Sequence, residues 1–344
     1  MSLHPFWSAA ARLSGRVDFQ ALVPTLRRGS LPPSPRDLAQ AGISAAHVAA
    51  LARGDWLTQP GDALTVVDPA WPPALEGVPY APVVLFHRGR LELLQVPAVA
   101  IVGSRHCTTQ GQRMARRLAQ AVTSRGGVVV SGLAHGIDHA AHQASLERTI
   151  AVLGQGLDAP LTARQADLAR QIVDQGGLLL SELPPETRAT KWTFPQRNRV
   201  IAGLARATVV VEAADRSGAL ITARQALALG RDVLAVPGSP LDPASAGCLD
   251  LIAAGAGVAR DHRDLERYLP TPALSGPTPA LPEGSALEPM VAAHLRAGTT
   301  VDQLAGSLGW PGHRVAALLM GLELTGQVER LPGDRFALPS RRAP

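Results

Sequence analysis

Hydrophobic residues in the middle of the chain follow two alternating patterns. Short runs rich in Val, Ile, Leu and Ala are separated by longer stretches in which apolar residues recur every three or four positions. The first pattern is typical of strands buried on both faces of a parallel sheet, and the second of amphipathic helices. We predict strands at Val99–Val102, Val128–Val130, Thr149–Leu153, Leu178–Leu180, Val209–Val211 and Val233–Val236. We predict helices at Thr109–Arg125, Ala163–Asp174 and Ala219–Leu229. The alternation favours an α/β fold, a doubly wound, Rossmann-like and mostly parallel sheet.

Two proline-rich stretches divide the 344 residues. We expect a small helical domain, helix-hairpin-helix-like, over residues 1–62 and the Rossmann-like domain over residues 63–269. A linker is expected over residues 270–284, because Pro, Ser, Thr and Gly bury too little apolar surface to order a core. In residues 285–344, Thr300 and Gln303 form a capping box, and two helices precede a hairpin built from Val328–Arg330 and Arg335–Leu338. This order predicts a C-terminal winged-helix domain.

Composition places the chain among proteins of the cell interior. Nothing approaches the roughly 18 consecutive apolar residues of a membrane helix, and the first residues lack the features of an export signal. The two cysteines, Cys107 and Cys248, suit a reducing environment. We therefore expect a cytoplasmic protein that does not contact a membrane.

Three small turns follow predicted strands and precede helices. In a doubly wound sheet such turns share the carboxyl edge, where backbone amides and helix N-termini attract phosphate. Arg105 adds a cation and Ser131 a hydroxyl, although an ordinary strand-to-helix turn also explains each motif alone. The residues predicted to bind phosphate here are Gly103, Ser104, Arg105, Ser131, Gly132, Ser217 and Gly218.

A basic segment with two aromatic residues lies between Glu186 and Glu212, where no acidic residue occurs. It contains Lys191, the only lysine in the chain, next to Trp192. Aromatic rings stack on unpaired bases while Arg and Lys hold the backbone, so the segment favours binding of single-stranded nucleic acid. The alternatives are a solvated helix face and aromatic residues buried beneath a loop. The candidate residues are Lys191, Phe194, Arg197 and Arg199.

Motifs for catalysis are scarce. A Walker A loop needs Lys followed by Ser or Thr, but Lys191 is followed by Trp192. No glycine fingerprint for a dinucleotide follows a strand, and no acid lies about 20 residues beyond Gly103 to bind a ribose. No nucleophile elbow is present. We therefore predict no catalytic residues and no cofactor.

A small cluster of potential metal ligands has helical spacing, but Gly136 interrupts it and no further ligands follow. Helix-capping and packing roles are the better interpretation, so no metal is predicted. The cluster comprises His135, Asp138, His139 and His142.

Taken together, the motifs resemble those of the DNA-processing protein A (DprA, or Smf) family over residues 64–260. The resemblance rests on the following segments in order: Ile101–Arg105, Ser131–Asp138 with His142, Ser181-Glu182, Phe194–Gly203, Ser217–Ala223 and Pro237-Gly238. It implies single-stranded DNA binding, a homodimer formed through the Rossmann-like domain, and loading of the RecA recombinase during natural transformation or repair. It also implies a pocket built from Gly103, Ser104, Arg105, Ser131, Gly132, Lys191 and Phe194; Arg197 and Arg199 are added from charge and position.

Two departures from the family pattern occur. The family's Tyr-Pro, followed a few residues later by Asn or His, is here Ala159-Pro160 with Ala163 near the polar position. The family's Gly-x-Asn-x-Leu-Ile motif is here Gly-Cys-Leu-Asp-Leu-Ile, at residues 247–252. Both changes leave fewer polar side chains at the edge of the pocket, which puts base-specific contacts and nucleotide processing in doubt.

Two other functions remain as alternatives. A Rossmann-like nucleotide-processing enzyme, of the nucleoside monophosphate hydrolase type, would need a glutamate beside the sugar, for which Glu182 and Glu212 are the only candidates. A winged-helix transcription factor would need a basic reading helix, yet the segment His313–Met320 has one arginine. We therefore expect this domain to serve protein contacts more than DNA binding.

Overall fold

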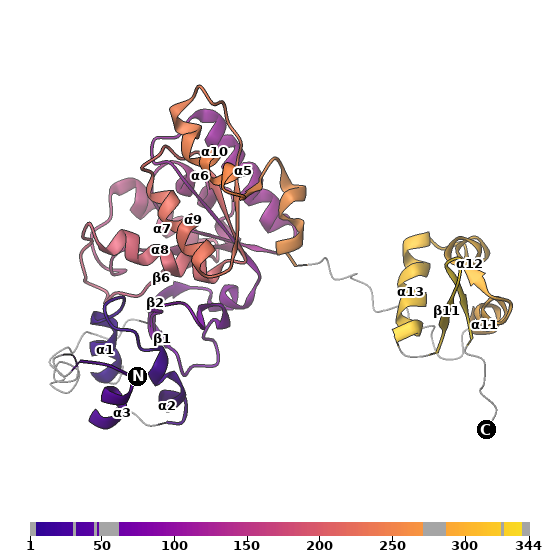
Figure 1. Cartoon of the computed structure of the whole chain (residues 1–344), viewed down its shortest axis with the longest axis horizontal. Helices are drawn as coiled ribbons and strands as arrows, with labels where there is room; N and C mark the ends of the chain where they lie inside the picture. The colour runs from indigo at the N-terminus through magenta and orange to yellow at the C-terminus, as the bar shows by residue number, and fades with distance from the viewer. Residues whose placement is uncertain are drawn as a thin grey trace. The chain divides into compact units, whose positions relative to one another are not determined.

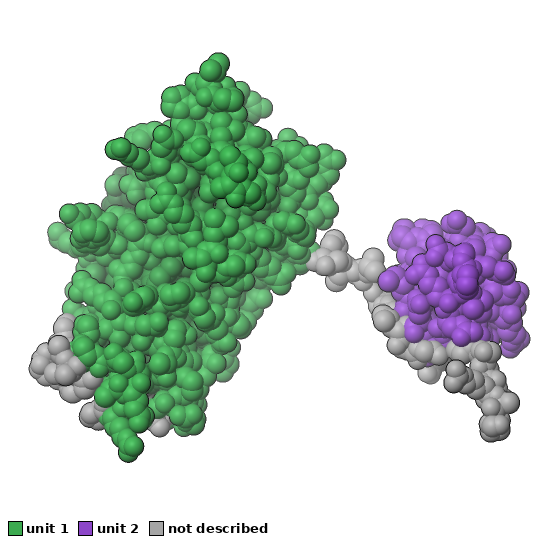
Figure 2. Space-filling model, in the orientation of Figure 1, with its two compact units in different colours: residues 1–271 green, residues 272–344 purple. Residues whose placement is uncertain are grey.

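The computed structural model describes residues 5–29, 32–44, 47, 62–270, 287–324 and 327–338. The chain divides into two compact units, Met1–Thr271 and Pro272–Pro344 (Figure 2). The predicted linker over residues 270–284 lies, apart from its first position, outside the described residues. Within the described ranges, every helix is too short or too polar to cross a membrane.

A nine-stranded sheet forms the centre of the first unit (Figure 1). Its strands are β1 (Ala63–Thr65), β2 (Val84–Gly89), β3 (Ala98–Gly103), β4 (Val128–Ser131), β5 (Thr149–Val152), β6 (Leu178–Ser181), β7 (Ala207–Val211), β8 (Asp232–Ala235) and β9 (Gly257–Val258). The order is β1-β2-β6-β5-β4-β3-β7-β8-β9. Strands β3 to β9 are parallel, and the antiparallel strands β1 and β2 extend the sheet beyond β6. The predicted mostly parallel α/β sheet is confirmed, and the antiparallel pair was not predicted.

Helices cover both faces of the sheet. They are α5 (Thr109–Ser124), α6 (Ile137–Gln143), α7 (Ala163–Asp174), α8 (Thr193–Leu204), α9 (Gly218–Ala228) and α10 (Ala246–Ala253). Successive side chains of β3 point to opposite faces, as strand geometry requires. Val99 and Ile101 pack with residues of α5 and α6, whereas Ala100 and Val102 belong to the cluster that includes α8 and α9.

Local capping explains where several of these helices begin. The Thr108 hydroxyl accepts a hydrogen bond from the Gly111 amide at the start of α5, and Thr162 forms a capping box with Gln165 at the start of α7. Such side chains satisfy amides that have no partner within the helix. Short 3-10 helices connect other elements: η1 (Gln20–Leu22), η2 (Pro73–Leu75), η3 (Leu91–Gln95), η4 (Leu146–Arg148), η5 (Pro243–Ser245) and η6 (His262–Tyr268).

The N-terminal helices share the hydrophobic core of the sheet. They are α1 (Pro5–Arg12), α2 (Val23–Arg27) and α3 (Pro35–Gln40). Phe6, Trp7 and Phe19 are buried in one cluster with Phe86 of β2. The sequence favours a separate domain over residues 1–62, but the described part of this segment lies in the same compact unit as the sheet. The physical reason is that helices this short become stable by packing on a larger apolar surface.

The second unit is a winged-helix domain with its own core. It consists of α11 (Leu287–Ala297), β10 (Thr299–Thr300), α12 (Val301–Leu308), α13 (Gly312–Leu324), β11 (Glu329–Leu331) and β12 (Arg335–Ala337). The strands pair in the order β10-β12-β11, and Val291, Leu304, Leu319 and Phe336 are buried together. The predicted capping box of Thr300 with α12 is present. The winged-helix prediction is therefore confirmed.

Candidate functional site

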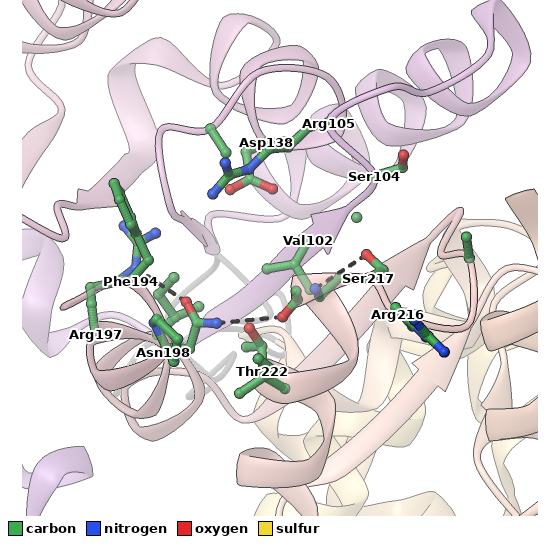
Figure 3. Close-up of a pocket in the computed structure, with 18 of the residues that line it drawn as sticks. Val102, Ser104, Arg105, Asp138, Phe194, Arg197, Asn198, Arg216, Ser217 and Thr222 are labelled. Atoms are coloured by element: carbon green, nitrogen blue, oxygen red, sulfur yellow. Dashed lines mark hydrogen bonds between the residues drawn. The ribbon is translucent and has the colours of Figure 1, made fainter. Parts of the chain in front are cut away.

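A crevice lies at the carboxyl edge of the sheet between β3 and β7. Strand β3 has β4 on one side and β7 on the other, so the chain connections turn in opposite directions at this point. Doubly wound sheets bind ligands where the strand order reverses in this way. The crevice has a volume of about 600 Å³ and is lined by the loops after β3, β4 and β7 and by the start of α8 (Figure 3).

The loop after β3 carries an exposed cation into the crevice. A side chain at Gly103 would meet the Val211 carbonyl oxygen at 2.0 Å, so only glycine fits there. The Ser104 amide donates to the Glu212 carbonyl at 2.8 Å, which fixes the loop. The Arg105 guanidinium lies 5.6 Å from the centre of the Phe194 ring. Among the described residues, no carboxylate pairs with Arg105.

The turn after β4 is held by internal hydrogen bonds. The Ser131 hydroxyl is fully buried and donates to the Ile101 carbonyl at 2.6 Å. The Gly132 amide donates to Asp138 at 3.0 Å. Both polar groups therefore hold the turn, and the expected contact of the Ser131 hydroxyl with phosphate gives way to this structural role. Gly136 approaches the preceding loop so closely, at φ 78°, that a side chain would lie 2.2 Å from the Ser104 carbonyl oxygen.

Two buried side chains of opposite charge, Arg197 and Asp138, line the inner part of the crevice. The Arg197 side chain is only 4% exposed and donates to the carbonyls of Gly132, at 2.9 Å, and of Val152. Burial lowers the pKa of Arg197 to about 10 and raises the pKa of Asp138, while each charge partly offsets that effect on the other. Arg197 lines the crevice, but its hydrogen bonds are made inside the protein.

Arg199 does not line the crevice. Its guanidinium donates to both carboxylate oxygens of Glu182, at 2.8 and 2.6 Å, and to the Tyr80 carbonyl at 2.7 Å. The Ser14 hydroxyl donates to the same carboxylate at 2.6 Å. Arg199 is 8% exposed, so its donors are used in linking α8 to the N-terminal segment rather than in facing a ligand. Glu182 lies 17 residues before Arg199, just outside the acid-free stretch, so the charge pattern within that stretch did not reveal this partner.

Neither glutamate proposed for the enzyme alternative lines the crevice. Glu182 is paired with Arg199, and Glu212 accepts hydrogen bonds from the amide and hydroxyl of Thr108 at the start of α5. A carboxylate held in this way is not placed to attack or orient a sugar. Neither candidate glutamate is therefore placed to act on a nucleotide bound in the crevice.

The residues just before α8 and the first turn of that helix present the only lysine of the chain and two aromatic rings. Trp192 is 71% exposed, and the Lys191 ammonium lies 5.1 Å from the centre of its ring. Phe194 is half-buried and lines the crevice together with Lys191 and Arg105. Trp192 is thus a surface residue rather than a core residue beneath a loop. The structure brings the predicted cations Arg105 and Lys191 to one crevice.

The turn after β7 adds residues that the sequence analysis missed. Arg216 is exposed and lines the crevice beside the predicted Ser217 and Gly218. The Ser217 hydroxyl caps α9, whose amino end borders the crevice and favours an anion. Asn198 accepts from the Arg197 Nε at 3.2 Å and donates to the Gly218 carbonyl at 3.5 Å (Figure 3). Arg216 directly precedes the Ser217-Gly218 turn at the carboxyl edge, and this position is the sequence feature that could have identified it as a site residue.

The histidine cluster in the described residues does not form a metal site. The His142 Nδ1 lies 2.7 Å from the Thr149 hydroxyl, which donates to the Val129 carbonyl and so accepts from the ring. The Leu133 amide donates to His142 Nε2 at 3.4 Å. These contacts define a neutral imidazole with a proton on Nδ1. Burial, followed by the charges of His139 and Arg197, lowers the pKa of His142 to about 3.

Folding stability is therefore expected to fall as the pH falls below about 6.5. Under these conditions the unfolded chain binds a proton at His142 that the folded protein does not, so stability declines by about 1.4 kcal/mol per pH unit until the folded pKa is reached. The His142→Gln variant keeps an acceptor but cannot be protonated, and it should show a flatter dependence. Urea unfolding between neutral pH and pH of about 5 measures this difference. Identical pH profiles for the two proteins would contradict the assignment.

Comparison with known proteins gives consistent matches over both units. The model of the family described as DNA recombination-mediator protein A matches residues 62–270, and that of the DprA winged helix domain matches residues 275–334. Protein Smf of Escherichia coli is 38% identical over 301 residues, covering 84% of this chain and 80% of its own. DNA processing protein DprA of Streptococcus pneumoniae is 44% identical over 204 residues, covering 58% and 72%.

Two solved structures share the fold. The X-ray structure of DprA from Streptococcus pneumoniae superposes with a TM-score of 0.61 at 35% identity, covering 78% of this chain and 99% of its own. DNA processing protein A from Helicobacter pylori superposes with a TM-score of 0.55 at 26% identity, covering 60% and 94%. The latter structure concerns the single-stranded DNA binding mode of that protein.

Proposed function

This chain belongs to the DNA recombination-mediator protein A family, and from that premise we propose that its crevice binds single-stranded DNA without catalysing a reaction. The observation that carries the proposal is the convergence of three exposed cations, Arg105, Lys191 and Arg216, on one crevice. In the described part of the chain none of them is paired with a carboxylate. Unpaired cations at one site attract a polyanion, because each phosphate contact releases a condensed counterion.

The rings supply a way to grip unpaired bases. The Phe194 ring lies beside Arg105 and the Trp192 ring beside Lys191, and Trp192 exposes most of its surface. Stacking of bases on aromatic rings is worth about 1–3 kcal/mol per base and tolerates any sequence. A duplex keeps its bases stacked on one another, so this arrangement favours single strands. We assign the phosphates to Arg105, Lys191 and Arg216 and the bases to Trp192 and Phe194.

The biological role we propose is that of a mediator. The protein would protect incoming single-stranded DNA as a homodimer and load RecA onto it during natural transformation or repair. Family membership supports this role, and the engaged state of Glu182 and Glu212 supports the absence of catalysis. For the winged-helix domain we propose protein contacts. The segment His313–Met320 has one arginine, Arg314, and its guanidinium lies 4.7 Å from the centre of the Trp310 ring instead of being free to contact DNA.

A salt-titrated binding assay on the full chain tests the proposal. We expect single-stranded DNA to bind more tightly than duplex, and a mononucleotide to bind at least about a hundredfold more weakly because it makes only one of the contacts. The logarithm of the binding constant should fall with the logarithm of salt with a slope of about −2 or steeper, for three or more phosphate contacts. Equal affinity for mononucleotide and strand, or release of free base, would contradict it.

A further inference from the structure

Helix α5 carries an uncompensated basic face outside the crevice. From Arg105 to Ile137 the sequence contains no Asp or Glu. Arg113, Arg116 and Arg117 are exposed, and within the described residues none of the three has a hydrogen-bond or ion-pair partner. Arg125, at the end of the same helix, is paired with Glu266. Three neighbouring arginines without counter-charge repel one another, which raises the free energy of the folded protein. A bound anion would lower it.

The three arginines, here called the arginine face, surround a shallow hollow. Residues three and four apart lie on one side of a helix, which brings these side chains together. The hollow has a volume of about 480 Å³ and its lining contains no acidic residue. Guanidinium groups and side-chain amides both donate to phosphate oxygens. The lining residues are Gln110, Arg113, Met114, Arg116, Arg117 and Gln120.

Helix α6 packs on α5 and also borders the crevice, so it lies between the arginine face and the crevice. Burial lowers the pKa of His139, and the charges of Arg164, His135 and Arg116 lower it further, so Arg116 lies close enough to α6 to act on it. The Arg164 side chain donates to His139 at 3.2 Å. Helices α5 and α6 pack directly on one another. At the crevice, His106 joins Arg105 in the lining.

The other flank of α5 has the opposite character. The hollow at the ends of β7 and β8 is lined by Glu212 and Asp242, and its one arginine, Arg260, is paired with Asp264. Negative charge there disfavours a phosphate backbone. The charge distribution thus directs a strand leaving the crevice toward α6 and the arginine face.

We propose that the arginine face (Arg113, Arg116 and Arg117) binds the phosphodiester backbone of single-stranded DNA that extends beyond the crevice. This inference rests on the proposed function, because it concerns the continuation of the same strand. The face has no exposed ring at its hollow, so it holds phosphates and does not read or stack bases. The crevice anchors the strand, and the arginine face lengthens the contact.

The test compares short and long strands on one triple variant, Arg113→Gln, Arg116→Gln and Arg117→Gln. Glutamine keeps the helix propensity of arginine while removing the charge. We expect an oligothymidylate of about six nucleotides to contact the crevice alone, so its binding to the triple variant should equal its binding to the unmodified protein. Binding of about thirty nucleotides should weaken roughly tenfold, and its salt slope should fall by about 2, for three lost phosphate contacts.

A matched control removes the same charge elsewhere. Arg16, Arg28 and Arg36 are exposed arginines of the N-terminal segment, and their replacement by Gln should leave the affinity for both lengths unchanged. Equal affinity of the two triple variants for the long strand would overturn the inference. So would an equal loss for short and long strands, or a loss confined to a duplex of the same length. If the unmodified protein binds neither strand, the proposed function itself fails, which is a separate outcome.

Discussion

The double variant Arg105→Ala, Lys191→Ala should bind single-stranded DNA about a hundredfold more weakly than the unmodified protein. Both cations line the crevice and have no carboxylate partner in the described residues. A hydrogen bond to a charged group contributes about 1.5–3 kcal/mol, so two such contacts at the lower end amount to about 3 kcal/mol, or two factors of ten. Fluorescence anisotropy with a labelled oligonucleotide measures the change, and the salt slope should decrease by about 1.4.

A charge-matched control separates the crevice from the general field of the protein. Arg206, directly before β7 at the opposite edge of the sheet, and Arg36 of α3 are exposed and do not line the crevice. The variant Arg206→Ala, Arg36→Ala loses the same two charges and should bind within about twofold of the unmodified protein. Unchanged affinity in the Arg105 and Lys191 variant would refute the assignment of the crevice.

The variant Arg199→Ala should lose about 3–5 kcal/mol of folding free energy, because it leaves the buried Glu182 carboxylate without its partner. The two side chains are 10% and 3% exposed and meet at 2.6 Å. The pair also links α8 to the Tyr80 carbonyl and, through Glu182, to Ser14. Urea unfolding followed by circular dichroism measures the loss as a lower midpoint.

A second variant distinguishes structural from DNA-binding roles of this arginine. Replacing both partners, Arg199→Met with Glu182→Leu, removes the unpaired charge and should recover most of the stability lost in Arg199→Ala. At a temperature where the double variant is folded, its affinity for single-stranded DNA should match that of the unmodified protein. A loss of DNA affinity with unaltered stability would instead make Arg199 a ligand of the strand.

Burial separates the basic residues in and just before α8 into two groups. Lys191, which precedes the helix, is exposed, whereas Arg197 and Arg199 are buried and donate hydrogen bonds to the distant carbonyls of Gly132 and Tyr80. All three were predicted as DNA contacts from one acid-free stretch. A desolvated guanidinium requires such partners, and its donors are then unavailable to a ligand. The proposed contact set therefore keeps Lys191 and adds Arg216.

Local patterns were sufficient for the parallel sheet, because strands buried on both faces and amphipathic helices each have a period that can be read along the chain. They also placed the turn with Arg105 at the carboxyl edge, since consecutive parallel strands end on the same side, whereas a pocket shared with Lys191 followed from the family resemblance. Long-range packing was needed for the rest. The antiparallel pairing of β2 with β6, the shared core of Phe19 and Phe86, and the hydrogen bond from Arg199 to the Tyr80 carbonyl all join segments far apart in sequence. Burial and pairing depend on what packs against a residue, and a periodic pattern carries no information about that neighbour.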